Sequence, residues 1–168
     1  MKRIGFGQVE PNHLSAQRTG QIYAQLPADS SIDILENGEF VKYDYAAGKV
    51  NKTGEGEWML VFNEVKLYDG NRETYKDYAM KKADAVNGEI VPRVFKTNVG
   101  DIYTTNMVEK ASVGKDAETT LTDLSVGDKL GIDGGYLKEG ASSDIQFKVV
   151  KVYTMADGQE AVKIQRIA

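Results

Sequence analysis

The stretch that decides the fold is residues 145–167, which read IQFKVVKVYTM (145–155), ADGQE (156–160) and AVKIQRI (161–167). The first segment predicts a long strand and the third predicts a strand that returns beside it. Asp157 and Gly158 stand between them, and an Asp-Gly pair between two strand-like runs is a strong hairpin signal. This is the clearest antiparallel hairpin in the chain.

Further strands are predicted on the N-terminal side of this hairpin. Asn37 and Gly38 separate residues 32–36 from residues 39–43, and an Asn-Gly pair predicts a hairpin with a type I′ turn. Residues 57–62 (EWMLVF) form a continuous apolar run, which predicts a central strand buried on both faces. Pro92 lacks an amide donor, so the strand at residues 89–95 is expected at a sheet edge or a bulge.

These signals predict a mainly β protein made of small β-barrel or sandwich domains, with at most one short helix. The one helix candidate is residues 73–85 (ETYKDYAMKKADA), for which a strand is the alternative. Residues 109–120 are polar and read as a linker or a long loop. The expected organisation is an extended arm over residues 1–22, a β domain over residues 23–110, and a C-terminal β-barrel-like domain or subdomain over residues 111–168.

The N-terminal arm is expected because residues 5–20 mix Gly, Pro, Asn and Ser with few large apolar residues and follow no regular period. The alternatives are a frayed tail and a segment held by a partner. We favour the second, because the arm carries apolar side chains that can dock in grooves. The candidate partner-binding residues are Ile4, Phe6, Leu14, Ile22 and Tyr23.

Composition excludes several classes of protein. With no cysteine, the chain has neither a disulfide framework nor a thiolate zinc site. The net charge of −4 gives no support for a nucleic-acid partner, although a local basic patch remains compatible with it. No apolar run reaches the length of a signal peptide or a membrane span, so we expect no membrane association.

Residues suited to catalysis are few. His13 is the only histidine and lies in the predicted arm, where a general base would lack a rigid setting. No phosphate-binding glycine loop occurs in the right context, and no cofactor or metal site is predicted. Glu55, Glu57 and Asp133 are the acids that a two-carboxylate hydrolase could use, but exposed acids are the default for this residue type. We therefore expect a protein that is not an enzyme.

Nine tyrosines point toward binding instead. Tyrosine is enriched in the cores of protein interfaces because it buries a large area and keeps a polar group. It is also an ordinary half-buried strand residue, and a sugar-binding platform would use it as well.

Three segments resemble small structural proteins of tailed bacteriophages: NGEFVKYD at 37–44, WMLVFNEVKLYD at 58–69 and IVPRVFKTNVGDIYTTN at 90–106. Such proteins accompany the major capsid protein as auxiliary or decoration components. The resemblance covers roughly residues 20–106 and carries no catalytic motif.

The resemblance implies a virion protein, assembled in the host cytoplasm, that binds the major capsid protein as a homo-oligomer on the capsid lattice. Repeated modest contacts would hold it through avidity, and the arm could add a strand to an open sheet edge. The alternatives are a carbohydrate- or host-surface-binding module and a neck or tail component of the virion.

Overall fold

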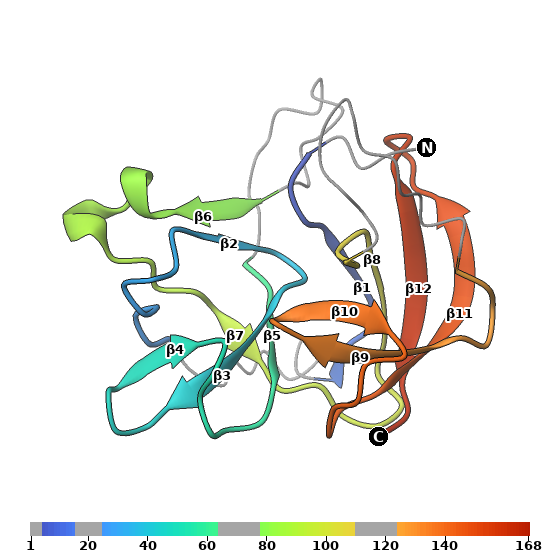
Figure 1. The fold of residues 1–168 in the computed structure, drawn as a ribbon. Coiled ribbons are helices and arrows are strands. Elements are labelled where there is room, and N and C mark those ends of the chain that lie inside the picture. Colours follow the sequence, from blue (N-terminus) through green and yellow to red (C-terminus); the bar gives the residue numbers. More distant parts are fainter. Residues whose placement is uncertain (1–4, 16–24, 64–77, 110–123) are drawn as a thin grey trace.

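The computed structural model describes residues 5–15, 25–63, 78–109 and 124–168. Its strands form three sheets, and the protein is mainly β, as predicted. The largest sheet is antiparallel and has the order β1-β8-β12-β11-β9-β10 (Figure 1). Its strands are β1 (Val9–His13), β8 (Ile102–Thr105), β9 (Lys129–Asp133), β10 (Tyr136–Glu139), β11 (Phe147–Thr154) and β12 (Glu160–Arg166).

The predicted C-terminal hairpin is confirmed. β11 and β12 pair from Phe147 opposite Arg166 to Thr154 opposite Glu160. The Met155 amide donates to the Gln159 carbonyl at 2.7 Å, and Gly158 has a φ of 84°, which a side chain would disfavour. The two strands lie in the middle of the six-stranded sheet, where β12 also pairs with β8 and β11 also pairs with β9.

A second sheet has the order β4-β3-β5-β7. Its central strand β5 contains Leu60, which packs into one hydrophobic cluster, and Met59 and Val61, which pack into another on the opposite face. The prediction of a central strand buried on both faces is therefore confirmed. The strands are β3 (Phe40–Asp44), β4 (Lys49–Asn51), β5 (Met59–Val61) and β7 (Val94–Phe95).

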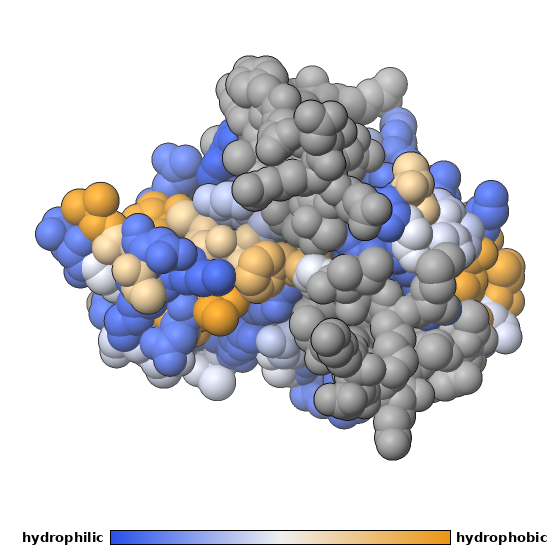
Figure 2. Space-filling model, turned by 90° about the horizontal axis from the view of Figure 1, so that it is seen from above, coloured by the Kyte–Doolittle hydropathy of each residue, from blue (hydrophilic) through white to orange (hydrophobic). Residues whose placement is uncertain are grey.

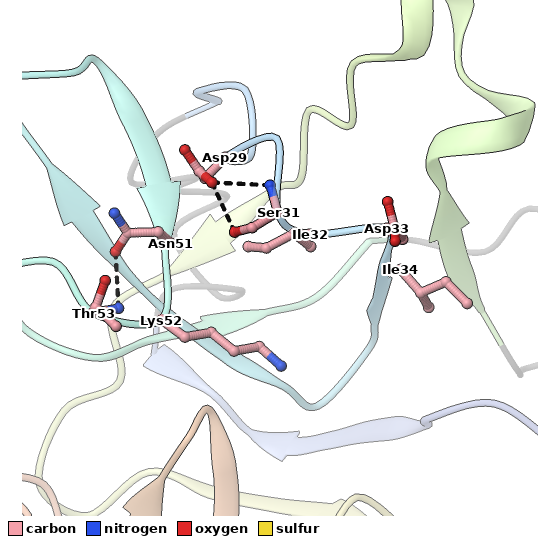
Figure 3. A pocket seen from close by; sticks show the side chains of 8 residues that line it. All are labelled: Asp29, Ser31, Ile32, Asp33, Ile34, Asn51, Lys52 and Thr53. Atoms are coloured by element: carbon pink, nitrogen blue, oxygen red, sulfur yellow. Dashed lines mark hydrogen bonds between the residues drawn. The ribbon is translucent and has the colours of Figure 1, made fainter.

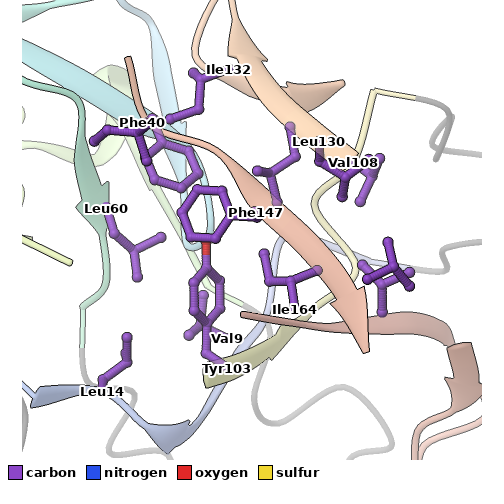
Figure 4. Close-up of a cluster of buried hydrophobic side chains, with 14 of the residues drawn as sticks. Val9, Leu14, Phe40, Leu60, Tyr103, Val108, Leu130, Ile132, Phe147 and Ile164 are labelled. Carbon is purple, nitrogen blue, oxygen red and sulfur yellow. The ribbon is translucent and has the colours of Figure 1, made fainter. Parts of the chain in front are cut away.

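The larger cluster fills the space between the six-stranded and four-stranded sheets (Figure 4). Its centre is aromatic: the ring of Phe147 on β11 lies 5.7 Å from that of Phe40 on β3 and 5.8 Å from that of Tyr103 on β8. Such ring pairs stabilise the fold beyond the contribution of the apolar area that they bury. The four-stranded sheet is thus the middle layer of the fold.

The third layer is a two-stranded sheet of β2 (Ile34–Glu36) and β6 (Ala79–Lys81). The 3-10 turns Lys82–Asp84 and Val86–Gly88 follow β6 directly. The helix predicted over residues 73–85 is therefore wrong for its described part, while residues 73–77 lie outside the described residues. Leu35 and Met80, opposite each other, pack on the second cluster, and this tertiary burial outweighs helix propensity.

The type I′ hairpin predicted at Asn37 and Gly38 is wrong. β2 and β3 do not pair with each other but belong to different sheets. Only Gly38 has a positive φ there, whereas a type I′ turn needs two such residues. The Asn37 side chain is buried and binds the backbone of Asn63: it donates to the Asn63 carbonyl at 2.9 Å and accepts from the Asn63 amide at 2.7 Å. The turn is therefore set by a distant loop.

The N-terminal arm is also corrected by the structure, because residues 9–13 form a strand of the six-stranded sheet and Val9 and Leu14 belong to the core. β1 pairs with β8, with Val9 opposite Thr105. Leu14 is 2% exposed and packs in the larger cluster. Gly7 has no room for a Cβ, which would lie 2.0 Å from the Asn37 carbonyl oxygen. Of the candidate binding residues in the arm, Phe6 is described and is 36% exposed.

The predicted division into three segments does not follow the sheets. The six-stranded sheet takes β1 from residues 1–22, β8 from residues 23–110 and β9 to β12 from residues 111–168. The larger cluster draws side chains from all three segments as well. Residues on both sides of position 110 therefore share one core.

The turn from β9 to β10 joins the two larger sheets. The Phe40 amide donates to the Gly135 carbonyl at 2.8 Å, and Gly134 and Gly135 both have positive φ. A Cβ on Gly135 would lie 2.7 Å from the Phe40 carbonyl oxygen, whereas a Cβ on Gly134 would meet nothing within 4 Å.

We expect Gly135→Ala to lower the free energy of unfolding by about 3 kcal/mol, from backbone strain and a steric clash together. Gly134→Ala should cost about 1 kcal/mol, because it suffers the backbone strain alone. Urea unfolding of the two variants measures the difference. Equal losses would contradict the close approach of this turn to β3.

Candidate functional site

The most exposed feature of the fold is a projection, here called the β2–β6 ribbon, made of residues 34–36 and 79–91. It extends away from the larger sheets (Figure 1). Val86 at its tip is 86% exposed, Val91 41% and Ile34 44%. Figure 2 shows apolar surface at this end of the molecule. Apolar side chains held clear of the core are typical of contact surfaces for other macromolecules.

The β2–β6 ribbon also presents strand edges. Hydrogen bonds from Asn37 to the Tyr78 carbonyl (3.1 Å) and from Lys82 to the Asp33 carbonyl (2.9 Å) fix its pairing pattern. Ile34 and Lys81 lie opposite each other between these bonds, as a pair that does not exchange hydrogen bonds. Their backbone groups therefore point to the outer edges, where an extended segment of another protein can pair.

Two polar pockets flank the loop after β4. The first, of about 440 Å³, is lined by Asp29, Ser31, Ile32, Asp33, Ile34, Asn51, Lys52 and Thr53 (Figure 3). Ser31 donates to Asp29 from its amide (2.9 Å) and its hydroxyl (2.7 Å), and these bonds lower the pKa of the Asp29 carboxyl. The pocket can therefore offer carboxylates beside apolar side chains.

The second pocket, of about 430 Å³, lies beside the same loop. Tyr45 is 71% exposed at its wall, with Asp44, Asn51 and Glu55 around it. Gly54 closes the loop against β3, since a Cβ there would lie 2.2 Å from the Tyr43 carbonyl oxygen. An exposed aromatic ring beside carboxylate and amide groups is a suitable arrangement for a polar ligand such as a sugar.

Glu39, Lys52 and Tyr136 form an ionic cluster beside the first pocket, which Lys52 also lines. Glu39 is 2% exposed, and its carboxylate lies 2.9 Å from the Lys52 ammonium. The Tyr136 hydroxyl donates to Glu39 at 3.3 Å, and the Lys52 ammonium lies 4.4 Å from the centre of the Tyr136 ring. The cluster ties β10 to the four-stranded sheet.

Burial governs the protonation of this cluster. Burial raises the pKa of the Glu39 carboxyl, and the charge of Lys52 offsets only part of that rise. Burial alone would lower the pKa of Lys52, but the Glu39 carboxylate outweighs it and raises that pKa. Burial and the charge of Glu39 also raise the pKa of the Tyr136 hydroxyl. Because the groups are already paired with one another, the cluster serves structure.

The predicted arm residues do not converge. Leu14 lies in the core and Phe6 near the surface, where the Lys81 ammonium is 4.8 Å from its ring centre. Ile4, Ile22 and Tyr23 lie outside the described residues.

Two of the acids considered for hydrolysis are held in ion pairs. Glu57 pairs with Arg166 at 3.1 Å and with Lys96 at 3.2 Å, while Asp133 pairs with Lys138 at 3.2 Å. Glu55 lines the second pocket without either of them. His13 is exposed on β1.

The Glu39–Lys52–Tyr136 cluster was not predicted. Its members are up to 97 positions apart, and nothing in their local sequence marks them as neighbours. In the part of the chain that the structure describes, no group of three or more His, Cys, Asp or Glu side chains could hold a metal ion, and no helix has the length and apolar character to cross a membrane. Comparison with protein families, curated proteins and solved structures gives no significant match.

Proposed function

We propose that this chain is a non-enzymatic structural protein of a phage virion, which binds the capsid formed by the major capsid protein and stabilises or decorates it. The observation that supports this most is the β2–β6 ribbon, with its exposed valines and open edges, anchored on the second hydrophobic cluster through Leu35 and Met80. A rigid support lowers the entropy lost when a contact surface is ordered on binding.

The proposed mechanism is attachment at many equivalent sites. Val86 and Val91 would enter an apolar depression of the capsid protein, and the edge of the β2–β6 ribbon would pair with an extended segment of it. As a homo-oligomer, the protein would engage several capsid subunits at once, so modest single contacts would add up through avidity. The protein would then reside in the virion after assembly in the host cytoplasm.

We expect Val86→Asp to weaken binding to purified phage heads at least tenfold, since burying one valine contributes about 1.5–3 kcal/mol. Val99→Asp is the matched control: Val99 is 68% exposed in the turn before β8 and should change binding less than about twofold. Co-sedimentation with heads measures both. Equal binding of Val86→Asp and the unmodified protein would exclude the ribbon tip as the contact.

A second candidate function is binding of a carbohydrate on a host surface. The observation that favours it is the pocket beside Tyr45, where an exposed ring meets Asp44, Asn51 and Glu55. A glycan-array screen of the protein and of Tyr45→Ala distinguishes the two functions. Signals that Tyr45→Ala abolishes would support host binding, and the absence of signals would leave the capsid role. Binding to purified necks or tails instead of heads would assign the protein to that part of the virion.

A further inference from the structure

The outward face of the six-stranded sheet carries four lysines, here called the lysine face: Lys129, Lys148, Lys151 and Lys163. The first two lie directly opposite each other on β9 and β11, and the other two on β11 and β12. Residues directly opposite in a sheet share a face. Gln165 lies opposite Lys148 and two positions from Lys163, which places both pairs on the same side.

The other face of these strands is the core. Val149 and Ile164, which alternate with the lysines, are fully buried. Lys129, Lys148 and Lys151 are exposed and Lys163 is half-buried. Ile102 on β8 and Val150, which is 39% exposed, add apolar surface to this face. The lysine face therefore combines charge with apolar area, as protein contact surfaces do.

The arrangement of charge works against stability. Like charges directly opposite each other on neighbouring strands destabilise a sheet. In the described part of the chain the ion pairs involve other lysines. Within the lysine face, the Lys151 ammonium lies over the Tyr153 ring, 5.2 Å from its centre. The chain as a whole is acidic, with a net charge of −4, yet it places two pairs of lysines where they repel each other. An anionic partner that neutralises these lysines would explain this arrangement.

We propose that the lysine face is a docking site for a carboxylate-rich surface of another protein. Carboxylates suit this face better than nucleic-acid phosphates do. Its cations are all lysines, whereas arginine is the better match for phosphate in planar, bidentate contacts. The face is a sheet surface, without the helix N-terminus that commonly holds phosphate. The net negative charge of the chain also opposes a polyphosphate at longer range.

The lysine face and the β2–β6 ribbon lie at opposite ends of the molecule (Figure 1). A protein with a contact at each end can bridge two neighbouring partners. If the partner is the capsid, which rests on the proposed function, the lysine face would reach a second subunit. The charge preference itself stands without that identification.

The test measures binding to two polyanions of matched length, poly-L-glutamate and duplex DNA, by fluorescence anisotropy. Lys148→Gln/Lys163→Gln removes one lysine from each pair, and Lys42→Gln/Lys49→Gln removes the same charge from β3 and β4, outside both proposed surfaces. We expect the first variant to lose poly-L-glutamate affinity at least tenfold and the control less than about twofold, with affinity falling as salt rises. The first variant should also melt at a temperature no lower than the unmodified protein, because it relieves repulsion.

Each other outcome overturns the assignment. Tighter binding of DNA than of poly-L-glutamate would identify a nucleic-acid site. Equal losses in the two variants, or a lower melting temperature of the first, would remove the lysine face as a dedicated site. The unmodified protein could instead self-associate in a salt-sensitive way that the first variant loses. The lysine face would then bind a second copy of this chain. If the unmodified protein binds heads but not poly-L-glutamate, only this inference is defeated. If it binds poly-L-glutamate but not heads, only the proposed function is defeated.

Discussion

Leu14→Ala is expected to lower the free energy of unfolding by about 3 kcal/mol, within the range of about 2–5 kcal/mol for buried leucines. Leu14 is 2% exposed and packs with Val9, Tyr103 and Leu60 in the larger cluster. Truncation there removes apolar burial and leaves a cavity between two sheets, which the surrounding strands can close only in part. The N-terminal segment would thus prove to be part of the fold.

Chemical denaturation with urea measures this effect, and Phe6→Ala is the control in the same segment. Phe6 is 36% exposed, so its truncation should cost less than about 1 kcal/mol. A small loss for Leu14→Ala, combined with weakened partner binding, would restore the arm as a separate binding element. A large loss for both residues would show that the whole segment is buried more deeply than the structure indicates.

Lys52→Ala is expected to cost about 3 kcal/mol at neutral pH, because removing the half-buried Lys52 ammonium leaves the charge of the buried Glu39 carboxylate uncompensated. Glu39 is 2% exposed and has the Lys52 ammonium at 2.9 Å. Another contact of the carboxylate, with the Tyr136 hydroxyl at 3.3 Å, is long for a hydrogen bond between oxygens.

The loss should shrink as the pH falls. Burial already places the folded-state pKa of Glu39 above its ordinary value of 4.5, and losing the positive charge of Lys52 raises it further. A carboxyl with a raised pKa binds more protons in the folded state, so its contribution to stability is full below the unfolded pKa and is lost as the pH rises through the folded pKa. Below both values Glu39 is neutral with or without Lys52.

Urea unfolding at pH 7 and near pH 4 tests this prediction, with Lys49→Ala on neighbouring β4 as the control. The difference between Lys52→Ala and the unmodified protein should be largest at pH 7, while Lys49→Ala should stay within about 0.5 kcal/mol at both values. A loss for Lys52→Ala that is constant across pH would mean that Glu39 is not the group left uncompensated.

Sequence patterns predicted the elements that are fixed locally. Asp157 and Gly158 set their own turn. The apolar run at residues 57–62 contains β5, whose residues are all buried. Both predictions are therefore confirmed. Gly134 and Gly135 set the turn between β9 and β10 in the same way. In each case the residues that decide the conformation lie within a few positions of one another.

Elements fixed by distant contacts could not be predicted. Asn37 looks like a hairpin residue but is held by Asn63, 26 positions away. Residues 9–13 show no clear period, yet their backbone pairs with β8, some 90 positions later. The candidate surfaces have the same origin: Lys148 and Lys163 face the same way because of the register of β11 and β12, which the sequence alone does not set.

The measurement that tests the central claim most directly is sedimentation of the purified protein with and without purified phage heads, with the bound amount followed to saturation. The proposed function predicts saturable binding at a whole-number ratio to the major capsid subunit, or to a fixed set of lattice sites. Protein that stays in the supernatant at every concentration, while remaining folded and monomeric, would contradict a role on the capsid.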